Sequence, residues 1–145
     1  MANKIKVDTR ELHVMTARVQ RDLNNIGSTM RKVTRYQEEQ TRQNFEQERS
    51  PDGSPWQEVT PQTRARKGSN KILHESGDLE EATEVIVEDL RASLVNDLIY
   101  ASTHQYGDPS RNIPQREFMG FSPQDEEAIA EIMREDIKKI LKRYR

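Results

Sequence analysis

Apolar residues recur at intervals of seven positions through the N-terminal part of the chain. They form one stripe, made up of Leu12, Met15, Val19, Leu23, Ile26, Met30 and Val33. This spacing predicts an amphipathic helix over residues 9–48, about 60 Å long at 1.5 Å per residue. Gly27 lies inside it, so the helix can kink there. After Val33 the stripe weakens to Gln40 and Phe45, and we expect the second half of the helix to be less buried within its own subunit.

A helix of this length is too long for the rest of the chain to cover. The sequence has 145 residues, of which 32% are apolar and 33% charged, so the remainder forms a small body with a thin core. The helix either lies across its own sheet with a solvated end or packs against neighbouring subunits. We favour the second interpretation, because joining copies or a partner would complete the stability of such a chain.

The middle of the chain predicts a small sheet. Alternating apolar residues indicate an antiparallel hairpin over residues 82–88 and 91–97. Residues 5–7 suggest a short strand, and residues 111–119 a further strand of the same sheet. Between them, residues 98–105 predict a short helix or turn.

The C-terminal helix has the clearest start signal. Ser122 is a good N-cap, Pro123 suits the first helical position and Asp125 completes a pattern like a capping box. The predicted fold is therefore α+β, with a long N-terminal helix and a C-terminal helix packed on a small, mainly antiparallel sheet. We expect one domain over residues 1–145, in which residues 1–48 form a long helical arm.

Large apolar residues crowd into residues 100–122, where a plain connector would not need them. We interpret this stretch as a structural clamp docked on the core or on a neighbour. A proline–glycine turn at residues 51–53 precedes Trp56, the one tryptophan. Trp56 either caps the core, which we favour, or anchors a subunit contact.

Few residues suggest catalysis. The chain has no cysteine, and its three histidines are isolated from one another in the sequence. His74 with Glu75, or His104 with Glu117, could form an acid–base pair after folding, but structural roles are the simpler interpretation. We predict no enzyme activity, no cofactor, no metal and no membrane span, and residence in a cytoplasm by default. The net charge of -2 provides no general attraction for nucleic acid.

Four ordered blocks carry a resemblance to a known family. They are FEQERSPDGSPW (residues 45–56), ILHESGDL (72–79), YASTHQYG (100–107) and IPQREFMGFS (113–122). In order and spacing they resemble the virion morphogenesis family of tailed bacteriophages, the Mu G-like tail completion proteins. One departure is Glu117, where the family usually has proline between the arginine and the phenylalanine; it puts the path of the loop at residues 116–118 in doubt.

The resemblance implies a non-enzymatic virion component at the junction of head and tail, made in the host cytoplasm. Such proteins are expected to form homo-oligomeric rings, commonly hexameric, that complete the tail or neck. The implied partners are neighbouring neck, connector or tail-terminator proteins and the tail tube.

Two groups of residues are candidates for these contacts. For the interface between subunits or with a partner we predict aromatic and arginine anchors, with two further residues shaping the loop: Trp56, Tyr106, Arg116 and Phe118, with His104 and Gly107. For the lumen, through which genomic DNA passes, or for an acidic neighbour we predict a basic set: Arg64, Arg66, Lys67 and Lys71.

A protein of another class remains as the alternative. The stripe from Leu12 to Val33 also suits a coiled coil, so the chain could be a small dimeric nucleic-acid-binding or regulatory protein. Neither predicted helix has a basic face, which argues against this alternative. A ring would contain six or more copies and a coiled coil two.

Overall fold

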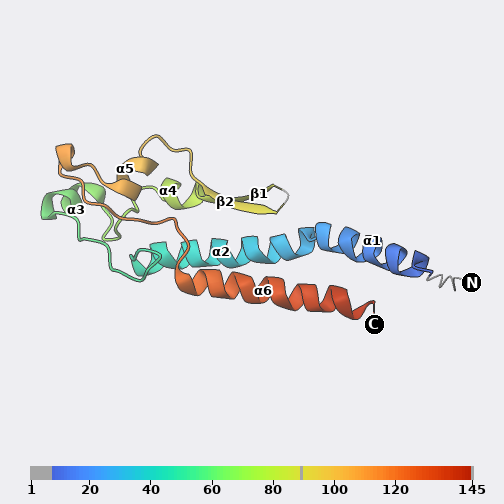
Figure 1. Cartoon of the computed structure of the whole chain (residues 1–145). Coiled ribbons are helices and arrows are strands. Elements are labelled where there is room, and N and C mark those ends of the chain that lie inside the picture. The colour runs from blue at the N-terminus through green and yellow to red at the C-terminus, as the bar shows by residue number, and fades with distance from the viewer. Residues whose placement is uncertain (1–7, 89, 145) are drawn as a thin grey trace, which may run out of the picture.

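A computed structural model describes residues 8–88 and 90–144. Its fold is α+β, as the sequence predicts. The molecule is elongated, and two consecutive helices run along much of its length (Figure 1). In that view a hairpin and a group of loops and short helices lie above them, and the C-terminal helix lies below. The strand predicted at residues 5–7 lies outside the described residues.

The predicted N-terminal helix is present, but it is divided into two. α1 spans Arg10–Asn24 and α2 spans Gly27–Gln47. Asn25 and Ile26 join them with ψ angles of 55° and 24°, outside the helical region. The break therefore precedes Gly27, which begins α2 instead of kinking the middle of a continuous helix.

Burial along the two helices is the reverse of our expectation. None of the residues of α1 is buried, and Leu12 is 61% exposed. α2 buries Thr29, Met30, Val33, Gln37, Thr41, Asn44 and Phe45. The prediction of a less buried second half is wrong, because α2 packs against both the hairpin and α6 (Pro123–Lys142), whereas the first half of α1 extends past the end of α6 (Figure 1).

The predicted hairpin is confirmed. β1 spans Glu84–Glu88 and β2 spans Arg91–Val95, and they pair antiparallel with Val85 opposite Leu94. Both of these side chains are half-buried, and the hairpin packs along α2.

The further strand predicted over residues 111–119 is wrong. Within the described residues the sheet has two strands. Asn112 takes a left-handed φ of 53°, and Pro114 lacks the backbone N–H that a sheet ladder would use. The segment leads back to the core instead, where the Arg116 N–H donates to the carbonyl of His104 at 2.8 Å.

Short helices and loops, and not the sheet, enclose the core. The helices are α3 (Pro61–Lys67), α4 (Asp78–Glu81) and α5 (Ala101–Tyr106), followed by the 3-10 turn η1 (Pro109–Arg111). α5 confirms the short helix predicted near residues 98–105. The buried cluster consists of Phe45, Trp56, Ile72, Leu79, Ala101 and Phe118. This cluster is small and lies at the end of the molecule opposite α1 (Figure 1), while Ile26, Met30 and Val33 are buried at the start of α2.

The start of α6 is confirmed as a capping box. The Ser122 hydroxyl accepts from the Asp125 N–H at 3.1 Å, and the Asp125 carboxylate accepts from the Ser122 N–H at 2.8 Å. Polar contacts then join α6 to α2. Asp136 forms an ion pair with Lys32 at 2.7 Å and accepts from the Thr29 hydroxyl at 2.9 Å.

Candidate functional site

Trp56 and the clamp residue Phe118 lie in the core of their own subunit. Both rings contact Phe45, with centroid distances of 5.7 Å and 5.5 Å. The Trp56 indole N–H donates to the carbonyl of Glu117 at 2.8 Å, which ties the turn at residues 51–53 to the clamp. Both side chains are buried, so the core-capping interpretation of Trp56 has support. Direct contact of either ring with a neighbouring chain stays a prediction, which this burial disfavours.

Gln105 fixes the position of the clamp, and the sequence analysis missed it. Its side-chain oxygen accepts from the N–H groups of Phe118 and Met119, both at 3.1 Å, and its amide nitrogen donates to the Met119 carbonyl at 2.8 Å. One buried amide therefore satisfies three backbone groups that would otherwise be costly to bury. The sequence signal that could have identified Gln105 is its place in the YASTHQYG block, which carries the family resemblance.

At the end of α5, Gly107 lies close to another segment of the backbone, whereas Tyr106 is exposed to solvent. Gly107 has a φ of +76°, and an added Cβ would lie 2.8 Å from the Gln115 nitrogen. A side chain there would collide with backbone, so Gly107 lets α5 and the segment after η1 approach each other closely. Tyr106 is 73% exposed, which leaves its ring free to contact another chain.

Arg116 is a buried cation that is held by backbone carbonyls. The residue is 6% exposed. Its Nε donates to the carbonyl of Gln57 at 2.7 Å and its Nη2 to that of Glu58 at 3.2 Å. Burial lowers the pKa of Arg116 from its ordinary value, and among the described residues the guanidinium has no ion-pair partner.

Arg116 lies at a pocket of about 360 Å3 that gathers more charge. The pocket is lined by apolar side chains, by basic groups and by two carboxylates: Val59, Leu73, Leu79 and Tyr100; Arg66, Lys67, His104 and Arg116; Glu75 and Asp78. These residues come from the second, third and fourth of the blocks that carry the family resemblance and from the segment that follows the first. Segments distant in the sequence thus converge on one pocket.

Burial is the main cause that lowers the pKa of the basic groups at this pocket. Burial lowers the pKa of Lys67, whose ammonium donates to the Lys71 carbonyl at 3.0 Å. Burial also lowers the pKa of His104, and the charges of Arg116, Lys67 and Arg111 lower it further. The His104 Nδ1 atom is buried and has no hydrogen-bond partner among the described residues. We refer to this site as the basic pocket.

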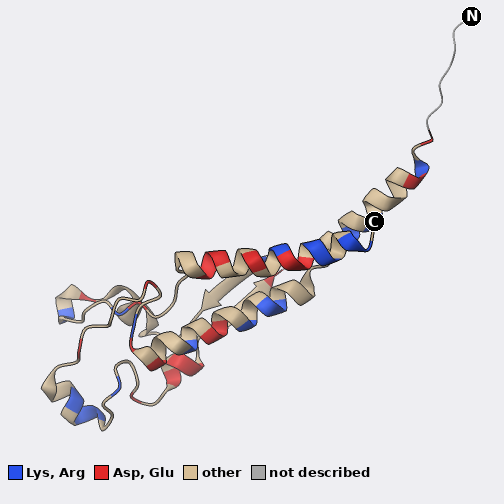
Figure 2. Ribbon diagram, turned by 90° about the horizontal axis from the view of Figure 1, so that it is seen from below, with Lys and Arg blue, Asp and Glu red and all other residues tan. Residues whose placement is uncertain are grey.

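The four basic residues predicted to face the lumen do not lie together in one place. Arg66 and Lys67 line the basic pocket, whereas Arg64 forms an ion pair with Glu58, and Lys71 is exposed. α3, which carries Arg64, Arg66 and Lys67, lies at the end of the molecule opposite α1 (Figure 2).

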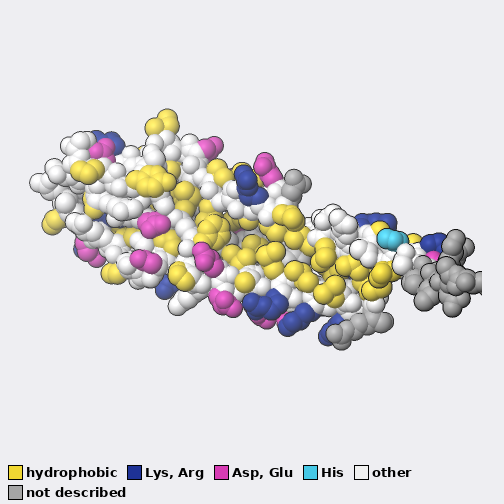
Figure 3. Space-filling model, viewed as in Figure 1, with side chains coloured by type: hydrophobic (Ala, Val, Ile, Leu, Met, Phe, Trp, Pro, Cys, Tyr) yellow, Lys and Arg dark blue, Asp and Glu magenta, His cyan; other side chains and the backbone are white. Residues whose placement is uncertain are grey.

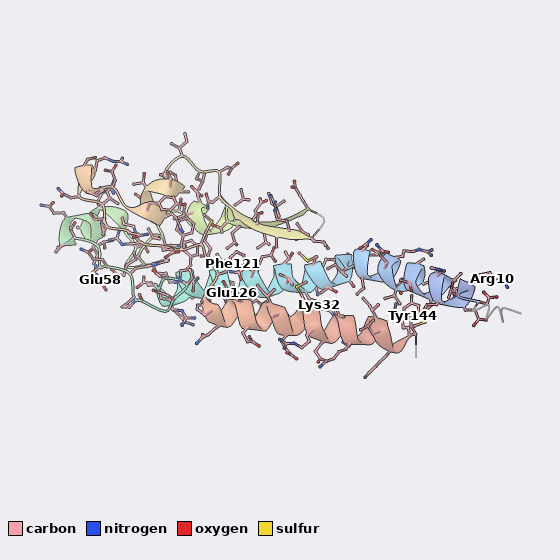
Figure 4. All side chains as sticks on the ribbon, in the orientation of Figure 1. Arg10, Lys32, Glu58, Phe121, Glu126 and Tyr144 are labelled. Carbon is pink, nitrogen blue, oxygen red and sulfur yellow. The ribbon has the colours of Figure 1, made fainter. Side chains whose placement is uncertain are left out.

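A second candidate surface lies at the α1 end. Val14 and Met15 are exposed there, beside a groove of about 490 Å3 that also contacts Tyr144. Figure 4 places Arg10 near the free end of α1 and Tyr144 at the end of α6. Apolar side chains gather along the middle of the molecule and continue toward α1 (Figure 3). We refer to the exposed apolar side of α1 that carries Leu12 and Met15, three residues apart, as the α1 stripe.

Some other kinds of site are absent from the part of the chain that the structure describes. Residues 8–88 and 90–144 contain no group of three histidine or carboxylate side chains that could hold a metal ion. None of the described helices is both long and apolar enough to cross a membrane.

Comparison with known proteins gives one match. The family model described as the phage virion morphogenesis family matches residues 7–138. No curated protein and no solved structure matches the chain. The match spans all four sequence blocks, the basic pocket, all of α1 and α2, and most of α6. The chain belongs to the phage virion morphogenesis family.

Proposed function

We propose that this chain is a non-enzymatic structural component of a tailed-phage virion, at the junction of head and tail, where its copies close a ring that completes the tail or neck. Membership of the family supports a role in virion structure or assembly. The observation that carries the ring is the exposed α1 stripe.

α1 contacts α6 in its own subunit, and the Tyr144 hydroxyl donates to Asp22, but the first half of α1 keeps its apolar side chains exposed. Helices of about 15 residues are marginal in water without tertiary packing. α1 has no buried residue, yet Leu12, Val14 and Met15 are exposed on it. Packing the α1 stripe against another chain would remove this apolar area from water and stabilise the helix.

The groove between α2 and α6 is a suitable receptor for the α1 stripe of a neighbour. This groove, of about 460 Å3, is lined mainly by apolar atoms and includes Tyr36, Ala128 and Ile132. Glu131 and Glu135 lie on its α6 side.

The groove is lined by three carboxylates (Glu131, Glu135 and Asp136) and two ammonium groups (Lys32 and Lys139), so its charge is slightly negative. α1 carries Arg10 and Arg18 beside the stripe, and these could pair with the carboxylates of α6. Acidic residues occupy the first half of α6 and basic residues its end (Figure 2). Because donor and receptor are different surfaces, the contact is heterologous, and repeated contacts of this kind form a ring when the rotation between neighbouring subunits closes.

Within such a ring, α3 and the exposed Tyr106 would face other proteins of the neck or tail, such as a connector, a tail terminator or the tail tube. Arg64 and Lys71 would be available to an acidic neighbour or to DNA in the lumen. Replacing Arg64 and Lys71 by glutamate would then lower DNA retention or joining, measured as the yield of infectious particles. Unchanged particle yield would contradict this contact.

The mass of the assembly in solution tests the ring. Multi-angle light scattering of the wild type, alone and with extracts of tails, should give six or more copies, and L12S/M15S should give smaller species. Ile99→Ser is the matched control, because Ile99 is 97% exposed but lies outside α1, and it should leave the assembly intact. A wild type that never exceeds two copies would instead support the dimeric coiled coil.

A charge swap tests the receptor. Glu131→Arg should weaken assembly, and adding Arg18→Glu should restore it, because the exchanged charges would again be complementary. Failure of the double variant to recover would exclude this receptor but not the ring.

A further inference from the structure

Cations outnumber carboxylates in the described lining of the basic pocket, with Arg66, Lys67 and Arg116 against Glu75 and Asp78. Removing a guanidinium from water is costly unless it is paired. Arg116 is more than nine-tenths buried and donates to two backbone carbonyls, which satisfy hydrogen bonds but carry no full charge. Lys67 likewise donates to a carbonyl. Such a site would be stabilised by an anion that enters it.

The shape and lining of the pocket select the kind of anion. About 360 Å3 is room for one or two side chains, and Val59, Leu73 and Leu79 provide apolar walls. Glu75 and Asp78 lie in the same lining and repel any anion, so the pocket favours a single negative charge over the dense charge of a nucleic-acid backbone. A singly charged carboxylate can form hydrogen bonds with the cations, and an apolar side chain next to it can pack against the apolar walls.

We propose that the basic pocket binds a carboxylate side chain, next to an apolar one, presented by a peptide segment of another virion protein. The Arg116 guanidinium and the Lys67 ammonium would bind the carboxylate, and the apolar neighbour would contact Leu73 and Leu79. This inference rests on the proposed function only in assigning the partner to the virion. The pocket lies at the end of the molecule opposite the α1 stripe, so both surfaces can be occupied together.

The pKa of His104 should reveal whether a carboxylate is bound. The charged groups that face its imidazole are Arg116, Lys67 and Arg111, and the carboxylates Glu75 and Asp78 line the same pocket. The Tyr100 ring lies 6.1 Å from the imidazole, edge to face. A carboxylate arriving beside the cations would offset their repulsion, so the pKa of His104 should rise on binding.

The test uses a matched pair of small probes on the full chain. N-acetyl-leucyl-glutamate amide and its glutamine counterpart have the same shape and differ in charge. NMR titration, with the His104 signal assigned by comparison with H104Q, should show binding of the glutamate probe and a raised His104 pKa. The glutamine probe should bind at least about tenfold more weakly, as expected for loss of charge-assisted hydrogen bonds.

Variants connect the binding to the pocket without unfolding it. Lys67→Gln should weaken binding of the glutamate probe about tenfold, whereas Lys142→Gln, an equivalent change at the end of α6, should not. Equal binding of both probes, tighter binding of inorganic phosphate than of the glutamate probe, or no change at His104 would each overturn the proposal. A wild type that forms rings yet ignores the glutamate probe would overturn it and leave the proposed function standing.

Discussion

α1 and α2 are consecutive helices that share one apolar stripe as far as Val33, and they differ sharply in burial. α1 exposes Leu12 and buries none of its residues, whereas α2 buries polar residues such as Gln37 and Asn44 as well as apolar ones. The difference lies in what surrounds each helix, because α2 packs against the hairpin and α6 while the first half of α1 projects beyond them (Figure 1). Apolar spacing identifies the side of a helix that can be buried, but other elements decide whether it is.

The two helices also differ in their hydrogen bonds. In α2 the buried Thr29 and Gln37 bond to groups distant in the sequence, Asp136 and the Gly120 carbonyl. In α1 the Thr16 hydroxyl donates to a carbonyl of its own helix, and only near the end of α1 does a described residue, Asp22, accept from a distant group, the Tyr144 hydroxyl at 2.7 Å. α2 is therefore specified by contacts within the subunit, whereas α1 retains an unused apolar surface.

The largest expected contrast is in side-chain truncation. Phe45→Ala should lower the free energy of unfolding by about 3–5 kcal/mol, because it removes a ring from the core. Leu12→Ala, at concentrations where the chain is monomeric, should change it by less than about 0.5 kcal/mol. Urea denaturation measures both. A comparable loss at Leu12 in the monomer would show that α1 is already packed within its subunit.

The next contrast removes one hydroxyl from each helix. Thr29→Val should destabilise the protein by about 1–3 kcal/mol, because the buried Asp136 carboxylate loses a donor. Thr16→Val removes an exposed bond within its helix and should stay within about 0.5 kcal/mol of the wild type. The same denaturation assay applies, and equal effects would contradict the distinction between the helices.

A smaller contrast is expected in how the stability of the protein depends on pH. The Lys32 ammonium and the Thr29 hydroxyl lower the pKa of Asp136 below 3.8. A carboxyl whose pKa falls on folding contributes stability above its unfolded pKa, and this is lost as pH decreases through the folded value. The stability difference between the wild type and Asp136→Asn should therefore be greatest near neutral pH and shrink below about pH 4.

Asp8 provides the control for this pH experiment. Arg10 lowers its pKa in a similar way, but the pair is exposed at the start of α1 and is screened by water. Asp8→Asn should therefore leave the pH profile of stability unchanged. A profile that responds to Asp8 and not to Asp136 would reverse the assignment.

Local features of the fold could be predicted from the sequence, and long-range ones could not. The capping box at Ser122 and the hairpin over residues 84–95 depend on residues close in the chain. The fate of residues 111–119 depends on their contact with α5, and no alternation of side chains reveals that. The basic pocket likewise brings Lys67 to His104 and Arg116 through folding of separate segments, although the residues themselves were identified as candidates.

The smallest effect is expected at the junction of the two helices, where Gly27 begins α2. Its φ is not left-handed, and an added Cβ would lie 3.7 Å from the Arg31 guanidinium, an ordinary contact. Gly27→Ala should therefore stabilise the protein by about 0.4–1 kcal/mol, because alanine has less freedom to lose on folding. The break at Asn25 and Ile26 should persist, since it precedes Gly27, and helix content by circular dichroism should change little. A marked rise in helix content would mean that Gly27 itself separates α1 from α2, and that the exposed helix can become a continuation of the buried one.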